Sequence, residues 1–162
     1  MMSNRAPRLQ PCVIAGVVLA ALVVSGAVFY GAGGKHLVIA DANSGRVYGR
    51  WPVKTGTEFS LEFIHSVNQT PVRDTFRVEG DTIVPTATRF SSFGAGMQSD
   101  LDEGQTLTRD GDAMVITGFT QSFKKLNLIV GTVSDHLLII GKEQVSLRER
   151  CGQNAHISIR VR

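Results

Sequence analysis

The sequence predicts an all-β domain, an antiparallel β-sandwich or barrel of about ten short strands, preceded by one N-terminal transmembrane helix. Two observations lead to this expectation. An uncharged apolar run lies near the N-terminus, and the rest of the chain consists of short segments rich in Val, Ile, Thr and Phe, separated by turn residues. The second part, about 128 residues long, is large enough for one packed domain and too small for two.

The apolar run has the composition and length of a membrane span. No charged residue occurs from Leu9 to Gly34, and Val13 to Tyr30 is nearly unbroken Val, Ala, Leu and Ile. This is close to the roughly 20 residues that cross a bilayer as a helix. Because Arg5 and Arg8 precede the run, the positive-inside rule predicts a cytoplasmic N-terminus.

The chain is therefore expected to have three parts. Residues 1–11 form a short basic cytoplasmic terminus, residues 12–34 anchor the protein in the lipid bilayer, and residues 35–162 form an extracytoplasmic domain in the periplasm or at the cell surface. The small residues Ser25-Gly26-Ala27 leave a second interpretation open, in which the segment is a cleaved signal peptide.

The domain itself shows the pattern of strands almost throughout, with no helix predicted after the first. The segment from Phe119 to Lys125 is expected to be a loop with Phe123 pointing inward, and Ser91 to Gln105 is the only long irregular stretch. The predicted strands are His36–Ala40, Arg46–Trp51, Glu58–Val67, Val72–Val78, Thr82–Phe90, Ala113–Thr117, Leu126–Val130, Leu137–Ile140, Gln144–Leu147 and His156–Val161.

Charge argues against nucleic-acid binding by the domain, and cysteine content excludes an internal disulfide there. Of 17 Lys and Arg residues, Arg5 and Arg8 precede the apolar run, which leaves 15 basic against 14 acidic residues in the domain. A nearly neutral domain without a basic cluster is not expected to bind nucleic acid. Cys151 is the only cysteine after the apolar run, so an internal disulfide is excluded there.

The segment from Phe59 to Val78 is predicted to form a hairpin with its turn at residues 68–71. In this register His65 faces Asp74 on an otherwise apolar face, and Glu62 faces Arg77 on the other. The predicted apolar pairs are Val67 with Val72, Phe63 with Phe76 and Leu61 with Val78.

The irregular stretch begins with Ser92-Phe93-Gly94-Ala95-Gly96-Met97. Glycines at alternate positions allow backbone amides to converge on an anion, or simply allow a sharp bend with Phe93 and Met97 in the core. The acidic run that follows lacks the ligand spacing of a calcium loop, and the four histidines show no metal-ligand spacing, so neither a metal nor a cofactor is predicted.

These motifs resemble a known family. The run His65-Ser66-Val67-Asn68-x-Thr70-Pro71-Val72-x-Asp74, followed by Ser92-Phe93-Gly94-Ala95-Gly96-Met97, is similar to the signature of the bacterial domain of unknown function 1850. The resemblance implies a small membrane-anchored protein associated with tripartite ATP-independent periplasmic (TRAP) transporters of the TAXI subtype. Its partner would be a separate TRAP membrane subunit or solute-binding protein, and no catalytic activity is implied.

Three interpretations of the predicted His65/Asp74 couple remain open: a structural hydrogen-bonded pair, a binding site for a partner or a carboxylate-bearing small molecule, and part of a hydrolase. A nucleophile is missing, because Ser66 points to the opposite face and Ser92 lies on no nucleophile elbow. We therefore expect a non-enzymatic accessory domain of a transport system, or else an independent small-molecule-binding domain. The candidate binding or interaction residues are His65, Asn68, Thr70, Asp74, Phe93, Gly94, Gly96 and Met97.

Overall fold

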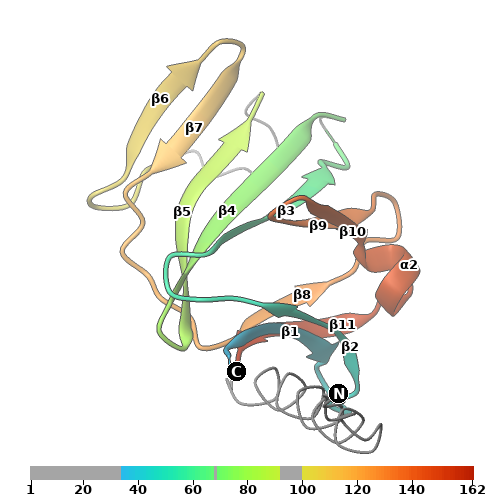
Figure 1. Ribbon diagram of the computed structural model, residues 1–162. Coiled ribbons are helices and arrows are strands. Elements are labelled where there is room, and N and C mark those ends of the chain that lie inside the picture. Colours follow the sequence, from blue (N-terminus) through green and yellow to red (C-terminus); the bar gives the residue numbers. More distant parts are fainter. Residues whose placement is uncertain (1–33, 68, 92–99) are drawn as a thin grey trace, which may run out of the picture. The chain divides into compact units, whose positions relative to one another are not determined.

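The computed structural model describes residues 34–67, 69–91 and 100–162. The predicted transmembrane segment, Asn68 and residues 92–99 lie outside these residues. Within them, eleven strands form two antiparallel sheets, and there is one short helix (Figure 1). This arrangement confirms the all-β prediction, and the two sheets form the layers of a sandwich. None of the helical structure in the described part is long and apolar enough to cross a membrane.

The smaller sheet has four strands in the order β2-β1-β11-β8. These are β1 (His36–Asp41), β2 (Val47–Pro52), β8 (Leu126–Ile129) and β11 (His156–Val161). The first and last strands of the domain pair with each other, with Leu37 opposite Val161, so the two ends of the domain are held in one sheet.

The larger sheet has seven strands in the order β10-β9-β3-β4-β5-β7-β6. Its central hairpins are antiparallel, as expected for strands joined by short connections. The strands are β3 (Glu58–Ile64), β4 (Pro71–Glu79), β5 (Thr82–Phe90), β6 (Thr106–Asp110), β7 (Ala113–Thr117), β9 (His136–Ile140) and β10 (Glu143–Ser146).

The core consists of two apolar clusters. The larger cluster joins both sheets and includes Phe59 and Phe76, whose rings stack with centroids 5.3 Å apart. A smaller cluster of Val72, Phe90 and Ile116 belongs to the seven-stranded sheet alone. In Figure 1, β6 and β7 project away from the four-stranded sheet. The smaller cluster therefore packs within the large sheet and not between the two sheets.

Two elements differ from the prediction. Strand β6 was missed because all of its residues are exposed and it lacks an alternating apolar pattern; its pairing with β7 depends on a tight turn in which Gly111 has φ +61°. The expectation of no further helix is also wrong, because α2 (Leu147–Cys151) follows β10. Ser146 caps this helix by accepting a hydrogen bond from the Glu149 amide, and Leu147 is buried beneath it.

Candidate functional site

The β3–β4 hairpin keeps the predicted faces but not the predicted partners. Phe59 lies opposite Phe76 and Phe63 opposite Val72, so the predicted pairing of Phe63 with Phe76 is wrong by four positions. A shift of four preserves the inward and outward faces, because side chains alternate with a period of two. The other predicted pairs of this hairpin fail for the same reason.

The shift arises at the connection between the strands. Strand β3 ends at Ile64 rather than at Val67, and the His65 amide donates to the Thr70 carbonyl oxygen at 2.9 Å. The Gln69 amide then donates to the His65 carbonyl oxygen at 2.9 Å. The turn is thus centred two residues earlier than predicted.

This register separates His65 from Asp74. Asp74 lies opposite Leu61, whereas His65 follows four residues later in the chain, beyond the end of β3. His65 lies in the loop, where its Nδ1 accepts a hydrogen bond from the Val67 amide at 3.3 Å. The predicted His65/Asp74 pair is therefore wrong, because His65 lies in the hairpin loop and Asp74 lies on β4.

The predicted charge pair on the outer face is corrected as well. Glu62 lies opposite Arg73, whose Nε donates to Glu62 Oε2 at 2.7 Å. Arg77 instead donates to Glu79 on its own strand. Of the other candidate residues, Thr70 lies in the hairpin loop, whereas Asn68, Phe93, Gly94, Gly96 and Met97 fall outside the described residues.

Asp74 lies on the inward face of β4, between the buried side chains of Val72 and Phe76. Thr88 lies opposite it on β5, and the Thr88 hydroxyl donates to Asp74 Oδ1 at 2.7 Å. Burial raises the pKa of Asp74 above its ordinary value, since it disfavours the charged form, and the Thr88 hydrogen bond partly opposes this shift.

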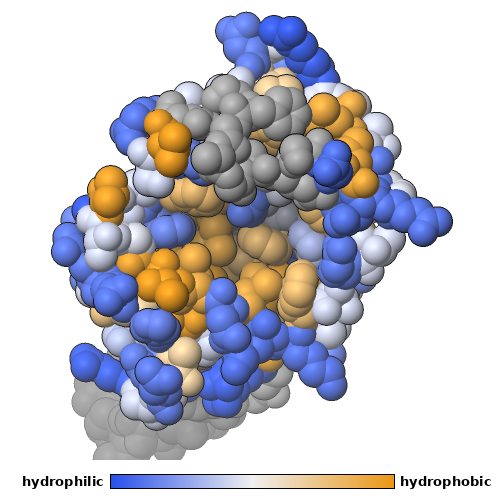
Figure 2. Space-filling view, turned by 180° about the vertical axis from the view of Figure 1, so that it is seen from behind, coloured by the Kyte–Doolittle hydropathy of each residue, from blue (hydrophilic) through white to orange (hydrophobic). Residues whose placement is uncertain are grey.

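One face of the molecule is hollowed, and hydrophobic side chains gather there (Figure 2). A cavity of about 400 Å³, which we call the Asp74 cavity, is bounded by β4, β5, β8 and the segments before β6 and after β7. Its polar lining residues are Asp74, Thr88, Asp102, Gln105 and Gln121. Its apolar lining residues are Phe76, Pro85, Ala87, Phe119, Phe123 and Leu126.

The cavity walls come from segments that are distant in sequence and held by backbone contacts. Ile83 and Phe123 exchange two backbone hydrogen bonds of 2.8 Å, which fixes the segment after β7 against β5. Gly118 has φ +83°, and a Cβ there would collide with the Gly104 carbonyl oxygen, so only glycine allows these two segments to approach so closely. The predicted loop with Phe123 is thus one wall of the cavity.

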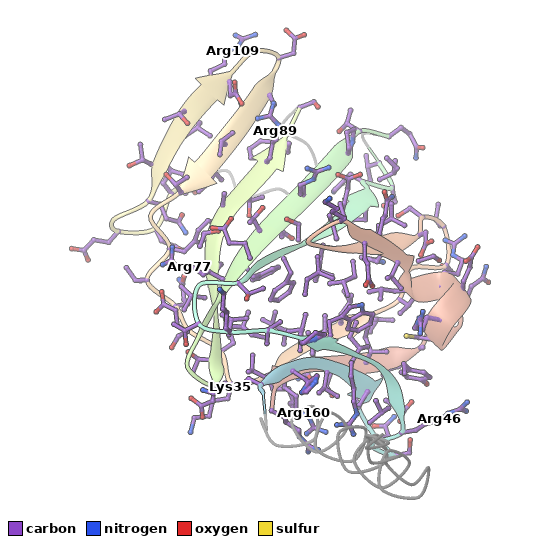
Figure 3. The ribbon with its side chains drawn as sticks, in the orientation of Figure 1. Lys35, Arg46, Arg77, Arg89, Arg109 and Arg160 are labelled. Carbon is purple, nitrogen blue, oxygen red and sulfur yellow. The ribbon has the colours of Figure 1, made fainter. Side chains whose placement is uncertain are left out.

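The charge of the lining limits what the cavity can bind. Asp74 and Asp102 are its ionisable residues, and the described lining contains no Lys, Arg or His. Figure 3 shows that basic residues such as Arg46, Arg77 and Arg109 lie apart from one another around the domain. The carboxylate-binding couple expected from a protonated His65 beside Asp74 is not assembled, and the cavity instead presents hydrogen-bond acceptors among apolar walls.

A second polar cluster, not predicted from the sequence, surrounds the start of α2. Asp135 accepts hydrogen bonds from the Ser146 hydroxyl at 2.5 Å and from the Arg148 amide at 3.0 Å. The spacing of Ser146 and Glu149, typical of a capping box, was the available signal in the sequence. These contacts hold a helix terminus and thus serve the fold.

His136 is also a structural residue in this arrangement. Its Nδ1 accepts a hydrogen bond from the Gly131 amide at 3.1 Å, and its ring lies 5.1 Å from that of Phe63. Burial lowers the pKa of His136, which favours the neutral ring. In residues 34–67, 69–91 and 100–162, no group of three or more His, Cys, Asp or Glu side chains could hold a metal ion.

No curated protein and no solved structure matches the chain. The family model described as Domain of unknown function (DUF1850) matches residues 59–147, more than half of the chain. The matched segment contains every residue that lines the Asp74 cavity. The chain therefore belongs to the DUF1850 family.

Proposed function

We propose that the β-domain binds a small organic molecule in the Asp74 cavity and acts as a ligand-contacting accessory domain of a TAXI-type TRAP transport system. The cavity carries this proposal. Its volume of about 400 Å³ falls within the range of small-molecule sites, and it combines apolar walls with a few polar groups on paired strands. Paired strands hold such groups more rigidly than loops do.

The sequence supports the location and the partner. The uncharged run within residues 12–34, preceded by Arg5 and Arg8, would tether the domain to the outer side of the cell membrane. There the domain would meet a TRAP membrane subunit or a solute-binding protein, as the family resemblance implies. The proposal assigns binding without turnover, because the separation of His65 from Asp74 removes the only acid–base couple that the sequence suggested.

The binding part is tested by recovering ligand from the full-length protein. The protein would be purified from native membranes in detergent, then denatured, and the released small molecules identified by mass spectrometry. Pro85 lines the cavity opposite Phe76, so Pro85→Trp would fill the cavity with an indole. Val133→Trp adds the same side chain at a position that is 74% exposed. A compound retained by wild type and Val133→Trp but lost with Pro85→Trp supports binding; equal recovery from all three contradicts it.

The transport part is tested by partner recovery from the same membranes. A TRAP membrane subunit or solute-binding protein is expected to co-purify with the tagged full-length protein. If the cavity ligand is recovered but neither partner is enriched over an untagged control, the domain is an independent binding domain and the accessory role is wrong.

A further inference from the structure

Among the described residues, every ionisable side chain that lines the Asp74 cavity is an acid. These are Asp74 on β4 and Asp102 in the segment before β6. The residues facing Asp74 across the sheet, Leu61 on β3 and Thr88 on β5, carry no charge. The sequence of residues 92–99 also contains no ionisable side chain. A negatively charged ligand would therefore meet two carboxylates and no Lys, Arg or His among the described lining residues.

Asp74 itself retains capacity to accept hydrogen bonds. Among the described residues, Thr88 is its one hydrogen-bond partner, and that contact uses Oδ1. A carboxylate can accept about four hydrogen bonds, so Oδ2 and part of Oδ1 remain for a donor in the cavity. A partly buried carboxylate with one donor is stabilised by a cation far more than an exposed one, because the surroundings screen the charge less.

The remaining walls are suited to an apolar body. Phe76, Phe119 and Phe123 line the same cavity as Asp74. Aromatic side chains provide apolar contact, and their ring faces attract cations. The outward-facing arginines nearby do not interfere, since Arg73 and Arg77 alternate with Asp74 along β4 and are paired with Glu62 and Glu79.

From this arrangement we infer that the ligand of the Asp74 cavity is an organic cation, with an ammonium or guanidinium group against Asp74 and an apolar or aromatic body against the phenylalanines. The inference rests on the proposed binding function and specifies its ligand class. It reverses the charge expected from the sequence, where a protonated His65 suggested a carboxylate ligand.

The pH dependence distinguishes the two ligand classes. A cation binds the ionised form of Asp74, so its affinity falls as pH is lowered through the pKa of Asp74, which burial raises above the ordinary value. A carboxylate ligand would require protonated Asp74 and would bind more tightly as pH falls. Asp102 is the other ionisable group in the lining, and Asp74→Asn separates its contribution from that of Asp74.

The test uses the full-length protein in detergent and three probes of one shape: phenethylamine, the neutral alcohol 2-phenylethanol and the carboxylate 3-phenylpropionate. Each is titrated by calorimetry against wild type, Asp74→Asn and a control, Asp81→Asn, which changes an exposed carboxylate. Phenethylamine is expected to bind wild type and Asp81→Asn at least about tenfold more tightly than the other probes, and to lose at least about tenfold in affinity with Asp74→Asn.

The other possible results show whether the cationic ligand class, the role of Asp74 or the proposed binding function is wrong. If the alcohol or the carboxylate binds best and Pro85→Trp abolishes that binding, the cavity binds ligand and the cationic class is wrong. If Asp74→Asn binds phenethylamine as wild type does, the role of Asp74 is wrong. If no probe binds at millimolar concentration and no compound is recovered from native membranes, both the ligand class and the proposed function fail.

Discussion

Replacing Thr88 with valine removes the one described hydrogen-bond donor to Asp74 while keeping the shape of a β-branched side chain. A hydrogen bond to a charged group contributes about 1.5–3 kcal/mol, and the observed bond is short, at 2.7 Å, and partly buried. We expect Thr88→Val to lower the free energy of unfolding by about 1.5–3 kcal/mol at pH 7. At a pH below 3.8, where Asp74 is protonated in both states, the loss should shrink to about 0.5–1.5 kcal/mol.

The sign of this pH dependence follows from the direction of the pKa shift. The pKa of Asp74 is raised in the folded protein, so the folded state binds its proton more tightly than the unfolded chain. The contribution of Asp74 to the free energy of unfolding is therefore most favourable below the ordinary pKa of 3.8 and decreases as pH rises through the folded pKa. Loss of the Thr88 donor raises the folded pKa further and makes this decrease larger.

The assay is urea unfolding of the full-length protein in detergent, followed by the fluorescence of Trp51. This is the single tryptophan of the chain, and it is 7% exposed in the core of the domain. Thr106→Val is the control, because Thr106 is exposed on the edge strand β6, and it should change stability by less than about 0.5 kcal/mol. Equal losses for Thr88→Val at pH 7 and below pH 3.8 would refute the assigned ionisation of Asp74.

Three further predictions test the hairpin, the cavity wall and the free thiol. A double-mutant cycle on Glu62 and Arg73 should give a coupling of about 0.2–1 kcal/mol, and its absence would argue against the observed register. Gly118→Ala should lower stability by at least about 2 kcal/mol, because it adds a positive-φ strain to a collision with the Gly104 carbonyl; an unchanged melting temperature would contradict this. Burial raises the pKa of Cys151 to about 11, so its labelling by a disulfide reagent at pH 8 should be about two to three orders of magnitude slower than that of an unfolded chain, and rapid labelling would show an accessible thiolate.

The strands were predictable where an apolar pattern marked them. The segment from Thr82 to Phe90 and the segment from Ala113 to Thr117 have the predicted bounds, because β-branched residues and flanking turns define them locally. Strand β6 has no buried residue and forms only because β7 offers it a partner, which is a property of the pair and not of its own sequence. The position of a strand can thus be predicted from its own residues, whereas its pairing partner cannot.

The same limit explains the outcome for the candidate site. The alternation of side chains correctly assigned Asp74 to the inward face, because parity survives a shift of four positions. The partner of Asp74 could not be predicted, because the length of a polar loop determines the register and the motif around His65 fits more than one turn. The walls formed by Phe119 and Phe123 depend on contacts with β5, about 40 residues earlier in the chain, which no local pattern encodes.

The central claim is that the Asp74 carboxylate faces an organic cation in the cavity. The most direct test is a pH titration of the Asp74 carboxyl carbon by ¹³C NMR, on the full-length protein in detergent, with and without saturating phenethylamine. Burial alone should give a raised pKa in the free protein, and a bound cation should bring that pKa down toward its ordinary value. A pKa of Asp74 that stays unchanged or rises further when phenethylamine is added would contradict the account.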